Sequence, residues 1–297
     1  VRDTVLWFAL IFGTGALTVT LWPSGWAIAP YLVYAVLYAT TSDSRWHEAG
    51  HGTAFATDWM NDALYEIASF MVMRESVFWR WSHIRHHSDT LVVGRDPEIA
   101  VPRPPFTRQI IATFFGLPGY PVYFRALVGH ALGRVSAADR EIVPESEFPK
   151  LFQRARVCLA IHAAVVLLAL WSWSVLPLLL VGLTNVFGTW LMVIYGYTQH
   201  AGMAEDVLDH RLSCRTVLMD RLHRYLYWNM GWHIEHHMFP TVPYHALPRL
   251  HEVVRPDMPA PYPGLIAAWR EIIPALRRQM RDPTYFVRRD VPAPPAS

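Results

Sequence analysis

The sequence predicts an all-α integral membrane protein, with four transmembrane helices in two hairpins and a helical cap on one side of the membrane. Two long stretches carry no Asp, Glu, Lys or Arg, and each is about twice the ~20 residues that cross a bilayer core. All arginines and the single lysine lie outside these stretches, in segments that also carry three clusters of histidines. We therefore expect the cap to hold a histidine-rich site.

The two uncharged stretches each contain a turn signal near the middle. The first runs from Thr4 to Ser42 around Pro23-Ser24-Gly25, and the second runs from Val157 to Gln199 around residues 172–177. Each stretch is therefore expected to cross the membrane and return. The predicted transmembrane helices cover residues 4–22, 26–42, 156–174 and 177–198.

Because both hairpins return, the N-terminus and the segments 43–155 and 199–297 lie on one side in a single membrane domain, 1–297. Arginines concentrate on that side, so the positive-inside rule predicts that it is the cytoplasm, with a bacterial inner membrane as the expected location. We expect no cleavable signal, because the first apolar run is too long. The alternative is a large soluble protein with buried apolar hairpins, but soluble cores seldom need two uncharged runs of this length.

The segment between the hairpins mixes apolar and polar residues. Residues 61–81 are expected to run along or into the membrane surface. Residues 106–132 are apolar but contain Pro118, Gly119 and Pro121, which favours an interfacial or re-entrant pair of helices. Four arginines are expected to anchor lipid headgroups: Arg103, Arg108, Arg125 and Arg134. The tail from Val291 to Ser297 is expected to be frayed.

The composition agrees with a membrane protein and excludes several other classes. Hydrophobic residues make up 53% of the chain, charged residues 17%, and 13 tryptophans suit long membrane–water boundaries. The net charge of +2 gives no reason to expect a nucleic-acid partner. Only Cys158 and Cys214 are present, which excludes a disulfide scaffold, a thiolate zinc ribbon and a four-cysteine iron–sulfur site. We expect both to be buried or incidental thiols.

The histidines have the spacing of metal ligands. Two motifs, one starting at His83 and one at His233, place histidines at i, i+3 and i+4, on one face of a helix, and His47 and His51 form an i, i+4 pair. Eight imidazoles exceed what one four-coordinate zinc uses, so we expect two metal ions. His200, where the fourth predicted helix emerges, is a ninth candidate. The candidate catalytic and metal-binding residues are His47, His51, His83, His86, His87, His200, His233, His236 and His237.

Other polar residues near these motifs have less specific expected roles. Acidic side chains close in sequence are candidates to orient the imidazoles; they are Asp43, Glu48, Asp89, Asp96, Glu205, Asp206 and Glu235. Asn229 is a candidate to hold a metal-bound water or to cap a helix. His162 is expected to be a satisfied buried group. Surface packing or hydrogen bonding is expected for His130, His210, His223, His245 and His251.

A different class of function must be weighed. His47-Glu48-Ala49-Gly50-His51 matches H-E-x-x-H, in which two histidines bind zinc and the glutamate acts as general base of a peptidase. A membrane zinc peptidase would need one more ligand and would leave both histidine triplets unexplained. It is the minority interpretation.

Taken together, the three histidine boxes resemble those of the membrane-bound fatty acid desaturase/hydroxylase superfamily, which has three boxes after paired transmembrane helices. That superfamily has a further histidine at the cytoplasmic end of helix four, matched by His200. The resemblance covers approximately residues 30–285. Residues 195–206 and 227–252 are most similar to a bacterial branch that includes the hydrocarbon oxygenase of rhizopine catabolism.

The resemblance implies a non-haem di-iron desaturase or monooxygenase: two iron ions, O₂ as co-substrate, and oxidation of an aliphatic C–H bond. A fatty acyl or other lipid is the first substrate class, desaturated or hydroxylated; the alternative is monooxygenation or demethylation of a small molecule or hydrocarbon. Three residues separate His47 from His51, where many acyl-CoA desaturases have four; this departure disfavours an acyl-CoA substrate and leaves other lipids or small molecules open.

A separate electron donor is also expected: a ferredoxin, rubredoxin or cytochrome with its reductase. The basic tail would attract an acidic donor or anionic membrane lipid. Its arginines are Arg277, Arg278, Arg281, Arg288 and Arg289.

Overall fold

The computed structural model describes residues 1–292, so part of the tail predicted to fray, residues 293–297, lies outside it. The described residues form helices and no strand. The helices of the first half are α1 (Arg2–Leu21), α2 (Ile28–Gly50), α3 (Asp58–Met71), α4 (Ser76–Ser88), α5 (Thr107–Phe114), α6 (Gly119–Ala131) and α7 (Ala137–Ile142). Those of the second half are α8 (Phe148–Trp171), α9 (Thr184–His200), α10 (His210–Ser213), α11 (Arg221–Leu226), α12 (His233–Met238), α13 (Leu247–Val254) and α14 (Leu265–Gln279).

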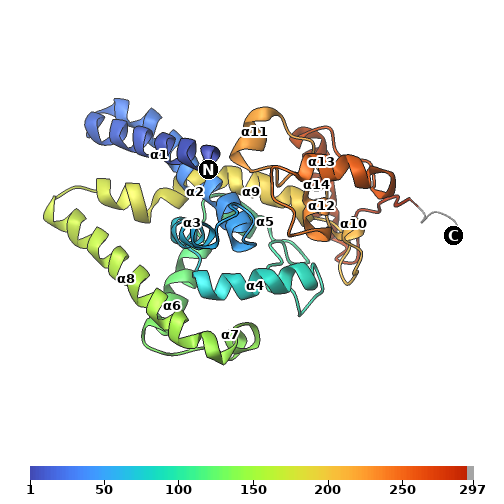
Figure 1. Cartoon of the computed structure of the whole chain (residues 1–297), viewed down its shortest axis with the longest axis horizontal. Helices are drawn as coiled ribbons and strands as arrows, with labels where there is room; N and C mark the ends of the chain where they lie inside the picture. Colours follow the sequence, from blue (N-terminus) through green and yellow to red (C-terminus); the bar gives the residue numbers. More distant parts are fainter. Residues whose placement is uncertain (293–297) are drawn as a thin grey trace.

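Two helical hairpins form one end of the molecule. α1 ends at Leu21, before the predicted turn, and α2 returns; α8 ends at Trp171, and a π-helical segment, Leu178–Gly182, leads into α9. Both turns point to the left in Figure 1, whereas α10 to α14 gather on the right. The turns of both hairpins therefore lie on the side of the molecule away from α10 to α14.

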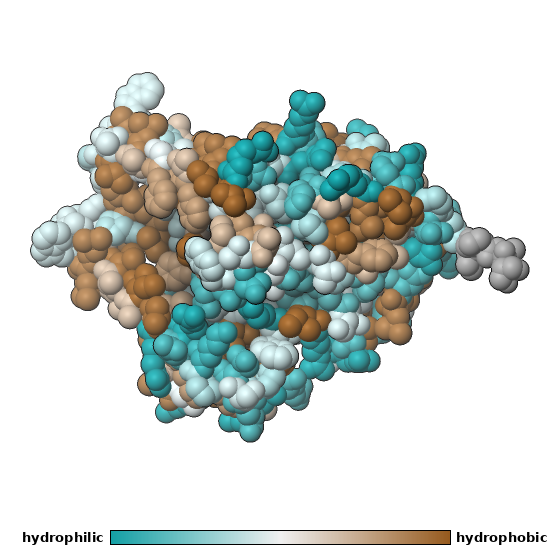
Figure 2. Space-filling view, viewed as in Figure 1, coloured by the Kyte–Doolittle hydropathy of each residue, from teal (hydrophilic) through white to brown (hydrophobic). Residues whose placement is uncertain are grey.

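Three helical stretches are long and apolar enough to cross a membrane: Arg2–Leu21, Glu145–Trp171 and Leu178–His200. They correspond to three of the four predicted spans. Apolar side chains such as Phe12 on α1 and Leu170 on α8 are exposed, and Figure 2 shows hydrophobic surface gathered over these two helices. These surfaces suit contact with lipid. The chain is thus a membrane protein with at least three candidate spans.

The fourth predicted span, residues 26–42, lies in α2, which is not among the three. The helix does not stop at residue 42 but continues to Gly50, through Thr40, Asp43 and Arg45. These polar residues lower its hydropathy, yet Thr40 and Arg45 are fully buried because α2 packs between α1, α3 and α9. Interior packing, rather than lipid, surrounds the polar half of this helix.

Short interhelical contacts fix α2 at the centre. Gly188 of α9 has no side chain where the backbone of Ala35 passes, and the hydroxyl of Thr40 donates a 2.6 Å hydrogen bond to the Gly188 carbonyl. At the other end, the Arg45 guanidinium donates to the carbonyl of Leu226 at 2.6 Å. It also lies 4.6 Å from the ring centroid of Trp228. The C-terminal end of α2, which carries the first histidine pair, is therefore held rigidly.

The region between the hairpins forms the rest of the scaffold. α3 packs Leu64 and Tyr65 against α2, and α5 and α6 are separated at residues 115–118, as the prolines predict. The prediction that Arg103 anchors a headgroup is wrong, because its guanidinium pairs with Glu205 at 3.0 Å. His162 is buried and 3.3 Å from the Tyr123 hydroxyl, which confirms it as a satisfied buried group.

Candidate metal centre

Four helices bring the nine predicted histidines together. The end of α2 carries His47 and, at its C-cap, His51; α4 carries the second box, α9 ends at His200, and α12 carries the third box. α2 and α12 are about 180 residues apart in the sequence, yet their histidines meet in one cluster. The histidine motifs thus lie in one region.

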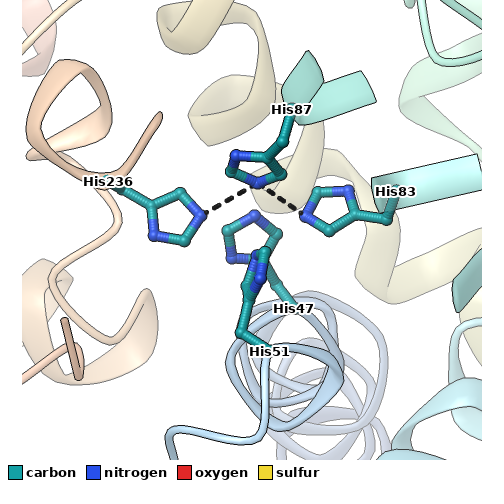
Figure 3. Close-up of side chains that lie close together, drawn as sticks. All are labelled: His47, His51, His83, His87 and His236. Atoms are coloured by element: carbon teal, nitrogen blue, oxygen red, sulfur yellow. Dashed lines mark hydrogen bonds between the residues drawn. The ribbon is translucent and has the colours of Figure 1, made fainter. Parts of the chain in front are cut away.

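The first cluster has five imidazoles from three helices. Each offers a ring nitrogen, and these atoms all lie within 4.8 Å of one another. Figure 3 shows the rings converging, with the Nε2 of His87 lying 3.1 Å from that of His83 and 3.2 Å from that of His236. The members are His47, His51, His83, His87 and His236. A set of this kind could hold one metal ion.

The second cluster lies beside the first. His86, His200 and His237 offer nitrogens within 4.8 Å of one another. His233 joins them, since its Nε2 lies 2.9 Å from that of His200 and 3.0 Å from that of His237. Four imidazoles from α4, α9 and α12 therefore surround a second position.

Each i, i+3, i+4 triplet is divided between the two clusters. On α4, His83 and His87 belong to the first cluster and His86 to the second. On α12, His236 belongs to the first, and His233 and His237 border the second. The prediction that each triplet shares one helix face did not anticipate this division. Each of the two helices links both positions.

The outer ring nitrogens of four of these histidines have acceptors that fix their tautomers. Asp96 carboxylate oxygens lie 2.9 and 3.0 Å from His86 Nδ1, and a Glu98 oxygen lies 3.1 Å from His83 Nδ1. The Ser213 carbonyl lies 3.0 Å from His200 Nδ1. A carbonyl can only accept, so this Nδ1 carries the proton and Nε2 keeps a lone pair. The carboxylates dictate the same tautomer.

Thr90 does the same for His237. Its hydroxyl donates a 2.6 Å hydrogen bond to the carbonyl of His86, so its oxygen accepts from the Nδ1 of His237 at 3.0 Å. The Nε2 of His237 is then unprotonated and carries a lone pair. His233 Nε2 thus faces two nitrogen lone pairs, on His200 and His237, and a single proton cannot serve both.

This donor set fits metal ions. Nitrogens 2.9–3.2 Å apart have about the separation of neighbouring ligands when metal–nitrogen bonds are ~2.0–2.1 Å. Within residues 1–292, both ring nitrogens of His47 and the Nε2 of His51 are buried without a hydrogen-bond partner. Buried polar atoms of this kind require a partner, and a cation between the rings supplies one.

Burial also keeps these imidazoles in the neutral form that binds metal. Burial, together with the positive charge that His86 carries when protonated, lowers the pKa of His51 to about 4. Burial and neighbouring imidazoles likewise hold the pKa of the other first-cluster members and of His233 and His237 well below the usual value. At neutral pH their lone pairs are therefore free for a metal.

Among the acidic residues predicted to orient imidazoles, only Asp96 does so directly. Glu235 instead accepts from His251 Nδ1 at 2.5 Å and from the Thr216 hydroxyl at 2.6 Å. The other five bond elsewhere: Asp43 to Arg74, Glu48 to Thr53 and Tyr244, Asp89 to Arg95, Glu205 to Arg103, and Asp206 to the Val93 amide. Sequence reasoning missed Glu98 and Thr90, although both lie within fifteen residues of the second box.

Asn229 and His210 also differ from expectation. The Asn229 side chain accepts from Arg224 and donates to the Tyr244 carbonyl, so it neither caps α12 nor belongs to a cluster. His210, expected to serve surface packing, lies with His237 and the buried Cys214 in a third group whose ligand atoms are within 4.8 Å. The i, i+4 spacing of His210 and Cys214 was the available signal.

The remaining histidines lie outside the clusters. His130 is buried with Nδ1 2.9 Å from Glu75, His223 lies 2.5 Å from Asp220, and His251 bonds Glu235 as described. His245 is exposed beside Tyr244. These four follow the prediction of hydrogen bonding or packing.

A cavity of about 330 Å³ opens onto the histidines. His47 and His83 of the first cluster line it together with His86, His200 and His233 of the second. Much of the remaining wall is apolar, including Leu91 and Val193. Its volume falls at the lower end of the ~300–1,000 Å³ typical of small-molecule sites.

The H-E-x-x-H motif lacks the arrangement of a peptidase. Glu48 is buried and accepts hydrogen bonds from the Thr53 hydroxyl at 2.7 Å and the Tyr244 amide at 2.9 Å. It belongs to none of the metal-binding groups found among residues 1–292. Its carboxylate therefore braces the end of α2, and the zinc-peptidase interpretation has no structural support.

Comparison with known proteins agrees with this geometry. Residues 4–269 match the family described as fatty acid desaturase. The chain is 25% identical to an acyl-lipid (9+3)-(E)-desaturase of Dimorphotheca sinuata, over 84% of this chain and 74% of that protein. It is 23% identical to two Arabidopsis thaliana proteins. One is an acyl-lipid omega-3 desaturase (cytochrome b5) of the endoplasmic reticulum, matched over 76% of this chain and 62% of that protein. The other is a chloroplastic sn-2 acyl-lipid omega-3 desaturase (ferredoxin), matched over 86% and 60%.

The family match covers most of the chain, including all nine histidines of the two clusters. The family and the named relatives indicate an oxidoreductase. The chain therefore belongs to the fatty acid desaturase family.

Proposed function

We propose that this protein is an O₂-dependent di-iron oxidoreductase that desaturates or hydroxylates an aliphatic carbon of a lipid acyl chain. The observation that carries the proposal is the convergence of nine imidazoles in two adjoining clusters, in which neighbouring Nε2 atoms lie 2.9–3.2 Å apart. Acyl-lipid desaturases among the relatives support the substrate class.

The residues have distinct roles in holding the metals. We assign one iron to the first cluster and the second to His86, His200, His233 and His237. Imidazole nitrogen suits iron, and two bound irons supply the redox chemistry that reduces O₂ and oxidises a C–H bond. Hydroxylation consumes R–H, O₂, two electrons and two protons and gives R–OH and water; desaturation consumes the same reactants and gives an alkene and two waters.

The chain's own residues orient and shield this chemistry. Asp96 and Glu98 accept the outer N–H of His86 and His83, which fixes the direction of each ring and raises its strength as a ligand. The apolar cavity walls exclude water and hold an aliphatic segment beside His47 and His233. Placement of the carbon decides between a double bond and an alcohol.

Electrons come from a separate protein. Two of the relatives carry cytochrome b5 or ferredoxin in their names, which supports a donor of one of these kinds; a rubredoxin is the third candidate. Arg277, Arg278, Arg281 and Arg288 are exposed on and after α14, and their positive charge favours an acidic donor. Arg289 is half-buried and hydrogen-bonded to the Ala260 carbonyl, so it contributes less.

The topology follows from the hairpins. With α2 as a fourth, protein-lined span, the chain forms one membrane domain whose N-terminus, histidine clusters and C-terminal helices share a side. The arginine distribution supports the cytoplasm for that side and a bacterial inner membrane for the location.

Iron-loaded protein in lipid nanodiscs, supplied with ferredoxin, its reductase, NADPH and ¹⁸O₂, tests the function. We expect acyl chains that have lost two hydrogens or gained one ¹⁸O, detected by mass spectrometry, and no product from His236→Ala. Protein that holds two irons but oxidises no acyl lipid would contradict the acyl substrate. Oxidation of a small hydrocarbon instead would favour the monooxygenase alternative.

A further inference from the structure

An ion pair lines the cavity that opens onto the histidines. Arg74, in the turn between α3 and α4, donates to the carboxylate of Asp43 at 2.6 Å, and their side chains are 18% and 16% exposed. Both residues line the cavity, so their exposed atoms face the space where substrate would lie. Apolar residues of similar volume often replace buried ion pairs without loss of stability, so stability alone does not explain a pair in this place.

The guanidinium of Arg74 is held in one orientation. Its central carbon lies 3.9 Å from the ring centroid of Trp46 and 4.7 Å from that of Trp79. Two aromatic faces and one carboxylate together restrict the side chain, which leaves its remaining N–H groups as preorganised donors.

Further polar groups line the same cavity. Gln199 donates from Nε2 to the Tyr227 hydroxyl oxygen at 2.5 Å, and both residues line the cavity with the ion pair. Apolar side chains supply much of the rest, including Leu91, Ile99 and Met192. A ligand that matches these walls has a polar end and an apolar body.

The ion pair, which would hold the polar end of the ligand, lies close to the histidines. Asp43 precedes His47 by four residues on α2, and four residues rise about 6 Å along the helix axis. An extended chain advances about 1.2 Å per bond, so roughly five bonds cover this distance. A substrate anchored at Asp43 and Arg74 therefore presents a carbon near its polar end, rather than one far along an acyl chain.

We propose that Asp43 and Arg74 form the anchor for a neutral polar group of the substrate, one that both donates and accepts hydrogen bonds, such as an alcohol or amide. The pair has no net charge, so a neutral group bridges it without leaving a charge uncompensated. The oxidised carbon then lies within about five bonds of that group. This position of attack rests on the proposed function; the anchor itself does not.

Binding of two matched probes tests the anchor without iron or turnover. Hexan-1-ol and methyl pentyl ether have the same number of non-hydrogen atoms, but only the alcohol donates a hydrogen bond. Trp46 and Trp79 stack on Arg74, so tryptophan emission should report occupancy. Wild-type protein should bind the alcohol about tenfold more tightly or better, as expected for hydrogen bonds to charged groups. Equal affinity for the two probes would overturn the proposal.

The variant Asp43→Leu with Arg74→Met should lose the preference and still bind both probes through the apolar walls. The matched control is Asp62→Ala with Arg80→Ala, which removes a 3.0 Å ion pair that joins α3 to α4 at the surface, outside the cavity. The control should keep the wild-type preference. A Leu/Met variant that still prefers the alcohol would overturn the anchor.

The single substitution Asp43→Asn serves if the double variant fails to fold, since it preserves shape and removes the charged acceptor. It should reduce the preference several-fold, and an unchanged preference would again overturn the proposal.

Product analysis separates the anchor from the proposed function. Iron-loaded protein given decan-1-ol should form products oxidised within about five bonds of the hydroxyl group, and oxidation confined to the far half of the chain would overturn the assigned position. A wild-type preference for hexan-1-ol without any oxidation product would support the anchor and contradict the proposed function instead.

Discussion

The Nδ1 of His86 lies 2.9 Å from a carboxylate oxygen of Asp96, and that carboxylate also accepts the backbone N–H groups of Leu91 and Glu98. Burial disfavours charge on the imidazole, but the hydrogen bond that His86 donates to Asp96 outweighs burial and raises the pKa of His86. The carboxylate thus fixes the ring, and its charge strengthens the Nε2 lone pair as a donor to metal.

Replacing Asp96 with Asn should weaken the second metal position. Loss of such an outer partner typically costs about 10- to 100-fold in metal affinity. The measurement is iron retained after dialysis against graded chelator. Asp89→Asn is the matched control, because Asp89 lies nearby in sequence but pairs with Arg95 at 2.7 Å. Equal iron retention by both variants would contradict a role for Asp96 in metal binding.

Substituting His236 by Ala should weaken one metal position selectively. His236 belongs to the first cluster, and its loss leaves the four imidazoles around the second position in place. We expect one of the two irons to be removed at a lower chelator concentration than from wild type, with the other held unchanged and activity lost. His245→Ala, at an exposed position, should hold both irons as tightly as wild type. Wild-type retention of both irons by His236→Ala would contradict the assignment of His236 to a metal position.

Much of the scaffold could be predicted from charge and spacing. Uncharged runs mark membrane helices because a bilayer core excludes charge, so α1, α8 and α9 lie near the predicted residues. The surroundings of α2 could not be predicted from hydropathy. Thr40 and Arg45 are buried by packing against other helices, and local hydropathy does not register such packing.

The candidate site was predicted as a set of residues but not as a geometry. Spacing alone placed each triplet on one helix face and could not divide His83 from His86 between clusters. Likewise, Glu98 and Thr90 contact imidazoles only because the loop after α4 folds back over it. Such contacts depend on the tertiary path of the chain.

A close helix crossing gives a test of the fold. A Cβ added to Gly188 would lie 1.9 Å from the carbonyl oxygen of Ala35, so α9 would have to move away from α2. Gly188→Ala should therefore destabilise the protein by roughly 3 kcal/mol or more, at the upper end of overpacking effects. Gly196→Ala on the same helix meets no atom within 4 Å and should be neutral or slightly stabilising. Thermal unfolding in detergent compares the two, and equal melting temperatures would contradict the crossing.

His130 should make stability depend on pH. Burial lowers its pKa, but the hydrogen bond to Glu75 at 2.9 Å outweighs burial and raises the pKa above the usual value near 6.5. Protonated His130 therefore stabilises the fold fully below about pH 6.5, and this contribution is lost as pH rises through the raised pKa.

Melting temperatures of wild type and His130→Ala from pH 6 to 9 measure this contribution. The difference between them should be largest at pH 6 and shrink toward pH 9. A difference that stays constant or grows with pH would contradict the charged pair.

Metal content of the purified protein in detergent, by plasma mass spectrometry, tests the central claim most directly. The two clusters predict about two irons per chain, together with O₂ consumption when an electron donor is supplied. If the protein instead holds a single zinc, and reconstitution with ferrous iron yields neither two irons nor O₂ consumption, the di-iron assignment is wrong.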